Sequence, residues 1–256
     1  YVAATGNILD NSPATNEVAD GGAVSAADQV KPTFTAARTA LNTIVLTFSE
    51  NVDVTTTNGA GYTLSTGTVT ANTDPAGSSN IITLTTSGVT GTSATPTVTY
   101  GATAGTTLDT AANEVADAFN TVASDGIKPT FTAARTALNT IVLTFSEPVT
   151  GSAILNSFTV AGASAVTNTA PSASTTVTLT TTGLTSTSGT PAVDYVVATG
   201  DIADAASNEV ANGGAVLAAD QVKPTFTAAR TALNTIVLTF SENVDVTTTN
   251  GAGYTL

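Results

Sequence analysis

Four amino acids are missing from this chain of 256 residues, which contains no cysteine, histidine, methionine or tryptophan. Without cysteine it can form no disulfide, no thiolate nucleophile and no thiolate metal site. Without histidine it has no imidazole base, no zinc site of the usual kind and no Ser-His-Asp triad. The missing cysteine does not indicate the cytosol, because exported proteins can also lack it.

Basic residues are scarce as well. Six Lys and Arg stand against 19 Asp and Glu, so the net charge is −13. Because so few cations cannot neutralise a run of phosphates, we expect no nucleic-acid partner. No apolar run approaches the roughly 20 residues that a membrane helix requires, so we expect no membrane insertion in this segment.

The composition also argues against an enzyme. Paired carboxylates can hydrolyse glycosides, but aromatic residues make up only 5% of the chain, and no long loop is present to build a sugar cleft. The missing tryptophan likewise disfavours a carbohydrate-binding module. We therefore expect no catalytic residues and no organic cofactor.

What the chain does contain is repetition. The twenty-residue block KPTFTAARTALNTIVLTFSE occurs three times without a change, beginning at Lys31, Lys128 and Lys223. Its copies are 97 and 95 residues apart, a period too long for a solenoid unit and right for a small β-sandwich domain. Every Lys and Arg of the chain lies in this block. The sequence therefore predicts a tandem array of domains.

Two kinds of repeat alternate. Residues 223–256 are identical to residues 31–64, whereas the second copy of the block continues differently after Glu147. The first thirty residues match the end of the second repeat. We therefore predict the C-terminal part of a B-type repeat at 1–30, an A-type repeat at 31–127, a B-type repeat at 128–222 and the N-terminal part of an A-type repeat at 223–256.

Strand signals dominate each repeat. In residues 43–48 apolar and polar positions alternate, which places Ile44, Leu46 and Phe48 on one face of a strand. Seven or so short strands separated by Gly, Asn, Asp and Ser predict an all-β, immunoglobulin-like sandwich. The strands of the A-type repeat are expected at 32–37, 43–48, 61–64, 67–71, 81–86, 97–100 and 118–123. Residues 108–118 predict either an ordered loop or one helical turn.

Three short motifs carry a family resemblance. They are KPTF at 31–34, LTFSE at 46–50 and LDTAANEVA at 108–116, with B-type equivalents at 143–147 and 201–211. In these motifs the chain resembles the bacterial Ig-like domains of S-layer and other large surface proteins. That family often has Gly before the late Asn, where this chain has Ala112 and Ser207. The resemblance implies an extracellular structural role at the cell surface and no chemistry.

Strand parity predicts where the acidic residues gather. In a seven-stranded sandwich, the incoming linker, the turn after the second strand and the long loop after the sixth strand share one pole. That pole collects acidic and amide side chains in every repeat, while the Arg38–Asn42 turn lies at the opposite pole and faces the next repeat. The candidate metal ligands are Asp28, Glu50, Asp109, Asn113, Asp125, Glu147, Asp204, Asn208, Asp220 and Glu242.

Clustered carboxylates repel one another unless something neutralises them, and three interpretations remain open. Calcium binds six to eight oxygen ligands from carboxylates, amides and carbonyls, so an interdomain calcium ion is one. An arginine of the neighbouring repeat, such as Arg38 beside Glu147, is the second. Solvated loop acids are the third.

Two functions fit these expectations. One is a structural lattice, such as an S-layer, sheath or surface filament, which self-associates through its side faces. The other is the extender region, or stalk, of a large adhesin, whose side faces should be inert. The alternation of A and B repeats favours the lattice or filament, because distinct neighbours can then be placed at fixed intervals.

Overall fold

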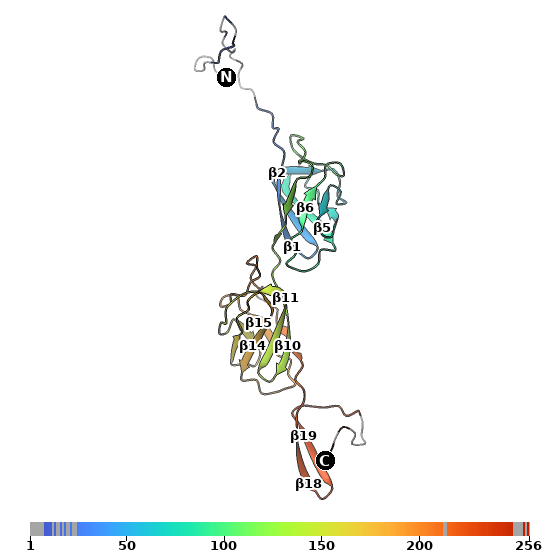
Figure 1. Ribbon diagram of the computed structural model, residues 1–256, viewed down its shortest axis with the longest axis vertical. Coiled ribbons are helices and arrows are strands. Elements are labelled where there is room, and N and C mark those ends of the chain that lie inside the picture. The colour runs from blue at the N-terminus through green and yellow to red at the C-terminus, as the bar shows by residue number, and fades with distance from the viewer. Residues whose placement is uncertain are drawn as a thin grey trace.

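The computed structural model describes residues 8–11, 13, 16, 18, 21, 25–211, 214–247, 253 and 255. Every regular element in these residues is a β-strand, and the strands form two sandwiches stacked end to end, followed by a hairpin (Figure 1). The predicted all-β, immunoglobulin-like fold is confirmed. No helix in the described part of the chain is long and apolar enough to cross a membrane.

The first sandwich consists of two sheets. The larger has the strand order β4-β5-β2-β1-β9, with β7 paired to β2, and the smaller has the order β3-β6-β8. Their bounds are β1 Phe34–Ala40, β2 Thr43–Val54, β3 Tyr62–Leu64, β4 Thr68–Asn72, β5 Ser79–Ser87, β6 Thr97–Tyr100, β7 Thr107–Asp109, β8 Asn120–Val122 and β9 Ser124–Asp125.

The second sandwich repeats this plan. Its sheets have the orders β13-β14-β11-β10-β17 and β12-β15-β16. The bounds are β10 Phe131–Ala137, β11 Thr140–Val149, β12 Phe158–Val160, β13 Ala165–Asn168, β14 Ser174–Thr182, β15 Ala192–Tyr195, β16 Val216–Leu217 and β17 Ala219–Asp220. The two cores draw on residues 34–123 and 133–218, which fall within the predicted ranges 31–127 and 128–222. The boundaries themselves stay a prediction.

The repeated block forms the same antiparallel hairpin wherever it occurs. Its first strand pairs antiparallel with its second, and Phe34 lies opposite Phe48 as Phe131 lies opposite Phe145. The predicted alternation holds, because Ile44, Leu46 and Phe48 are buried while Thr47 is exposed. Each strand therefore contributes one apolar face to a core between two sheets.

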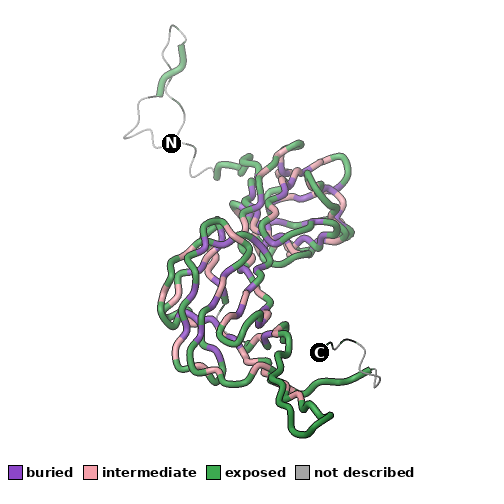
Figure 2. Tube along the Cα trace, turned by 60° about the horizontal axis from the view of Figure 1, so that its bottom comes forward, coloured by how far each residue is buried: buried purple, intermediate pink, exposed green. Residues whose placement is uncertain are grey.

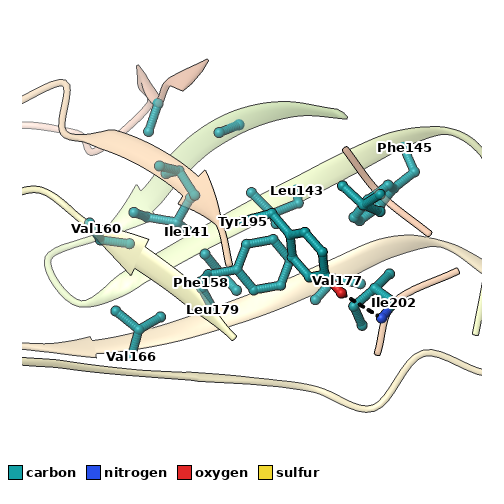
Figure 3. Close-up of a cluster of buried hydrophobic side chains, with 14 of the residues drawn as sticks. Ile141, Leu143, Phe145, Phe158, Val160, Val166, Val177, Leu179, Tyr195 and Ile202 are labelled. Carbon is teal, nitrogen blue, oxygen red and sulfur yellow. Dashed lines mark hydrogen bonds between the residues drawn. The ribbon is translucent and has the colours of Figure 1, made fainter. Parts of the chain in front are cut away.

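The core of the second sandwich combines branched aliphatic side chains with aromatic rings. Phe158 and Tyr195 pack with their ring centroids 5.1 Å apart, among Ile141, Leu143 and Leu179 (Figure 3). The hydroxyl of Tyr195 accepts a hydrogen bond from the backbone N–H of Ile202 at 2.9 Å. This bond fixes the start of the loop that carries Asp204.

The third copy of the block forms only a hairpin in the described residues. Strands β18 (Phe226–Ala232) and β19 (Thr235–Phe240) pair in the same register as their counterparts, but their side chains are largely exposed (Figure 2). Most of the predicted 1–30 segment lies outside the described residues, as does part of 248–256.

Residues 108–118 contain no helical turn, so the ordered-loop alternative is correct. Strand β7 ends at Asp109, and Ala112 then takes a φ of 67°, which is left-handed and incompatible with an α-helix. In the second repeat Ser207 has a φ of 69°. At these two positions the bacterial Ig-like domains that the sequence resembles often have Gly, the residue that a left-handed backbone favours.

Candidate metal site at the repeat junctions

A β-bulge places the glutamate of each repeat. Strand β2 pairs with β5 at Thr47↔Ile81 and next at Val52↔Ser79, so extra residues are inserted on β2 around Glu50. Strand β11 shows the same shift between Thr144 and Val149, around Glu147. A bulge re-aims the side chains within it and interrupts the regular alternation of the strand at each glutamate. The sequence motif Phe-Ser-Glu predicted a turn here, whereas the strands continue to Val54 and Val149.

The loop aspartate is held in a tight turn. Oδ1 of Asp109 accepts hydrogen bonds from the N–H groups of Ala111 at 2.8 Å and Asn113 at 2.7 Å, and Oδ2 accepts one from Nδ2 of Asn113 at 2.8 Å. Asp204 makes the same three bonds with Ala206 and Asn208. These hydrogen bonds hold one carboxylate in a fixed position at the pole of each sandwich.

The asparagine of this loop also binds the incoming linker. Nδ2 of Asn113 donates to the carbonyl oxygen of Asp28 at 3.2 Å, and Nδ2 of Asn208 donates to that of Asp125 at 3.1 Å. Both asparagines therefore act as donors that fasten the linker to the loop. A ligand role for their amide oxygens stays a prediction.

These three segments bring three carboxylates together at each junction. One oxygen each of Asp28, Glu50 and Asp109 lies within 4.8 Å of the others, and the same holds for Asp125, Glu147 and Asp204. We call these the first and second carboxylate triads. Six of the ten predicted ligands thus converge in the two groups that strand parity indicated. Three carboxylates offer up to six oxygen atoms, a set that suits a hard divalent cation.

The two triads differ in burial. Asp28 is exposed and Glu50 is half-buried, whereas Asp125 is half-buried and Glu147 is only 3% exposed. Neither carboxylate oxygen of Glu147 has a hydrogen-bond partner. A buried carboxylate without a partner is rare in proteins, because burial removes its water and leaves nothing in return.

The preceding repeat supplies the cover over Glu147. The hydroxyl of Thr92 donates to the carbonyl and hydroxyl oxygens of Ser146, next to Glu147, at 3.4 and 3.3 Å. A cavity of about 470 Å³ lies beside the glutamate, lined by Ser93 and Thr95 of the first repeat and by Ala205 of the second. The second triad is therefore assembled at an interface between two repeats.

Burial and like charge change the acidity of the glutamates. Desolvation raises the pKa of Glu147, the nearby Thr92 hydroxyl lowers it, Asp125 and Asp204 raise it, and the charge of Arg38 lowers it, with a net increase. Desolvation followed by Asp109 and Asp28 also raises the pKa of Glu50. Desolvation acts upward on Asp109, but the hydrogen bonds from Asn113 and Ala111 outweigh it and hold the pKa of that carboxyl below its usual value.

The third junction repeats the linker and the glutamate. Asp220 is exposed and Glu242 is half-buried, with Oε1 of Glu242 buried and without a hydrogen-bond partner. No third carboxylate joins them among the described residues. A ligand role for this pair stays a prediction.

Arg38 does not form the salt bridge with Glu147 that was one of the three interpretations. The side chain, predicted in the turn that faces the next repeat, is fully buried, and its guanidinium donates to backbone carbonyls. Nη2 binds the carbonyl of Leu41 at 3.1 Å, and Nη1 binds that of Thr92 at 3.1 Å. Further acceptors are the carbonyls of Val89, Gly91 and Ala94. Both Nη groups are occupied within the first repeat, Nε is buried without a partner, and the Glu147 oxygens receive none of the N–H groups of Arg38.

Comparison with known proteins adds little to this picture. No protein family and no curated protein matches the chain. A solved structure titled "Central Fibronectin-III array of RIM-binding protein" is 14% identical, with 83% of this chain and 80% of that chain covered and a TM-score of 0.20. A TM-score this low carries no argument about fold or function. The fold assignment rests on the strand pairing and the two cores.

Proposed function

We propose that this chain is part of a structural protein of the cell surface, in which tandem Ig-like repeats build an S-layer, a sheath or a surface filament. The protein acts outside the cell and associates with copies of itself. Its work is mechanical and requires no catalysis. The family resemblance of the KPTF, LTFSE and LDTAANEVA motifs motivates the location, and the junctions motivate the role.

The observation that carries the proposal is a junction built twice from the same contacts. Thr92 donates to the carbonyl of Ser146 at 3.4 Å, and Thr187, 95 residues further on, donates to that of Ser241 at 3.3 Å. Because the contact recurs with the period of the sequence, it favours the same relative placement for each pair of neighbouring repeats. An array built in this way gains length with regular geometry.

The outer sheet faces offer a surface for lateral association. Thr132, Thr144 and Thr176 lie side by side on neighbouring strands and are exposed, and the first repeat has Thr35 opposite Thr47. Rows of β-branched hydroxyl side chains on a pleated surface suit close packing of two sheets with hydrogen bonds between them.

A stalk is the second candidate, and the single-file arrangement favours it. The two sandwiches follow one another along the long axis of the molecule (Figure 1), and the hydrogen bonds from Thr92 to Ser146 and from Asn208 to Asp125 lie at their ends. An extender region of a large adhesin needs this geometry and no lateral contact.

Self-association distinguishes the two functions. Sedimentation velocity of the full chain over a wide concentration range, followed by electron microscopy, should reveal sheets or filaments for a lattice protein. A variant with Thr132, Thr144 and Thr176 replaced by Lys should then stay monomeric, while Lys at the exposed loop positions Thr110, Ser172 and Thr185 should not prevent assembly. A chain that stays monomeric with and without calcium would overturn the lattice in favour of the stalk.

A further inference from the structure

We propose that the second carboxylate triad, Asp125, Glu147 and Asp204, is a calcium site that joins the first repeat to the second. The site goes beyond the structural role proposed above and holds equally for a lattice or a stalk, because it concerns only the junction. It is built from the linker, the β11 bulge and the loop after β15, each of which supplies one carboxylate.

The buried glutamate is the observation that points to a ligand. Glu147 is 3% exposed, and one of its carboxylate oxygens lies within 4.8 Å of the oxygens of Asp125 and Asp204. Neither oxygen has a hydrogen-bond partner, because the nearby Thr92 hydroxyl, which acts on the pKa of Glu147, donates to Ser146 instead. The Nη groups of Arg38 donate to carbonyls of its own repeat, and neither oxygen of Glu147 receives a hydrogen bond from it. The unmet requirement is therefore for positive charge at one point between the three carboxylates.

The chemistry of that point suits calcium. Its ligands are all oxygen, they carry up to three negative charges, and carboxylates can bind in either one- or two-oxygen mode at a flexible site. The cavity of about 470 Å³ beside Glu147 gives a hydrated ion access and leaves room for water ligands. Magnesium requires stricter octahedral geometry and gives up its water reluctantly, so it should bind less well.

An ion at this place would connect the two repeats directly. Asp125 belongs to β9's end and the linker, whereas Glu147 and Asp204 belong to the second sandwich. Because Thr92 of the first repeat packs beside Glu147, binding would also hold the cover in position. The first triad has the same three residue types and should bind calcium more weakly, since its linker aspartate is exposed.

Calcium titration of the full chain by isothermal calorimetry tests the site. The wild-type chain should bind calcium at the second triad, and Glu147→Gln should remove one bound equivalent while keeping the shape of the side chain. Asp125→Asn should weaken the same site, because it removes one negative charge. Its amide oxygen can still accept the N–H of Ile127, so the local structure should be kept. Asp53→Asn changes the net charge by the same amount at an exposed position and should leave the titration unchanged.

Thermal melting distinguishes a Glu147 that binds calcium from a Glu147 that is only a buried charge without a partner. In chelator, Glu147→Gln should melt higher than the wild type, because a buried charge without a partner has been removed. In millimolar calcium the order should reverse, because only the wild type gains stability from the ion. The proposal is overturned if calcium does not bind, if Glu147→Gln and Asp125→Asn bind as many equivalents as the wild type, or if the order of melting stays the same in both conditions.

Discussion

The first and second carboxylate triads have the same three residue types in the same order, yet one glutamate is half-buried and the other is almost wholly buried. The bulge, the loop turn and the linker bond are shared by both. Thr92 and Ser93 of the first repeat pack over Glu147, and Pro148 follows this glutamate where Asn51 follows Glu50. The comparison teaches that the burial of a triad depends on the residues packed over it as well as on the three residue types that form it.

The largest effect is expected from removing the buried arginine of the covering repeat. Arg38→Met leaves five carbonyl oxygens without their donor, and hydrogen bonds to charged groups contribute about 1.5–3 kcal/mol each, so the first sandwich should lose about 3 kcal/mol or more. The pKa of Glu147 should rise further, because the charge of Arg38 lowers it. Urea denaturation measures the first effect and carbon-detected NMR titration the second.

Arg135→Met is the matched control for this prediction. Arg135 occupies the equivalent place in the second repeat and binds three carbonyls, so its loss should also destabilise. It lies at the far end of its sandwich from Glu147, however, and the pKa of Glu147 should not move. An equal rise in both variants would show that the covering repeat does not control the second triad.

A smaller effect, equal in the two repeats, is expected at the loop anchor. Tyr195→Phe leaves the buried N–H of Ile202 without an acceptor, and Tyr100→Phe does the same to Thr107, so each should lose about 1–3 kcal/mol. Burial is also the main reason that the pKa of Tyr100 is raised to about 12. Thermal melting of the two variants should give similar losses. A much larger loss in the second repeat would mean that the cover supports the loop as well as the glutamate.

Replacing the left-handed residue of the turn by glycine should raise the free energy of unfolding by about 1 kcal/mol. Ala112→Gly and Ser207→Gly remove the steric penalty of a side chain at φ values of 67° and 69° and should raise the stability of either repeat. Ala206→Gly, next to the strained position, is the control and should lower stability, because it only frees the unfolded chain. If Ser207→Gly also lowered stability, the turn would be held by contacts of the serine side chain and not limited by its backbone.

The smallest effect is expected in how the stability contributed by each of the two glutamates depends on pH. Because folding raises the pKa of Glu147 above 4.5, the native state holds its proton more tightly, and this contribution to stability is present below pH 4.5 and lost as the pH rises through the folded value. In chelator, Glu147→Gln should therefore gain stability over the wild type between pH 4.5 and neutrality.

Glu50→Gln should change in the same direction by less, because the pKa of Glu50 is also raised but the side chain is more exposed. Melting curves of both variants across this pH range measure the two gains. A gain at Glu50 that matches the gain at Glu147 would contradict the role of the cover.

Much of this arrangement could be predicted from the sequence. Alternation in residues 43–48 located the core face, and strand parity brought Asp125, Glu147 and Asp204 to one pole. Both inferences need only local geometry and the topology of a sandwich, which the repeat length indicated.

The burial of Arg38 and of Glu147 could not be predicted in the same way. Arginine is almost never fully buried, and its acceptors here are backbone carbonyls, which no residue type marks in a sequence. The burial of Glu147 depends on Thr92 and Ser93, which lie in another repeat and look like ordinary loop residues. The left-handed turn did leave a signal, since Ala112 and Ser207 stand where the Ig-like domains that the sequence resembles often have glycine.

The short strand at the end of each repeat determines how the array bears load. Strand β9 runs parallel to β1, with Ser124 beside Ala37 and Asp125 beside Arg38, and β17 runs parallel to β10 in the same way. Tension along the array pulls the start of β1 and the end of β9 in opposite directions. The hydrogen bonds between them lie across that pull, so they must break together and cannot open one after another. Each repeat is thus closed by a patch loaded in shear, and the linker that transmits the force leaves directly from it.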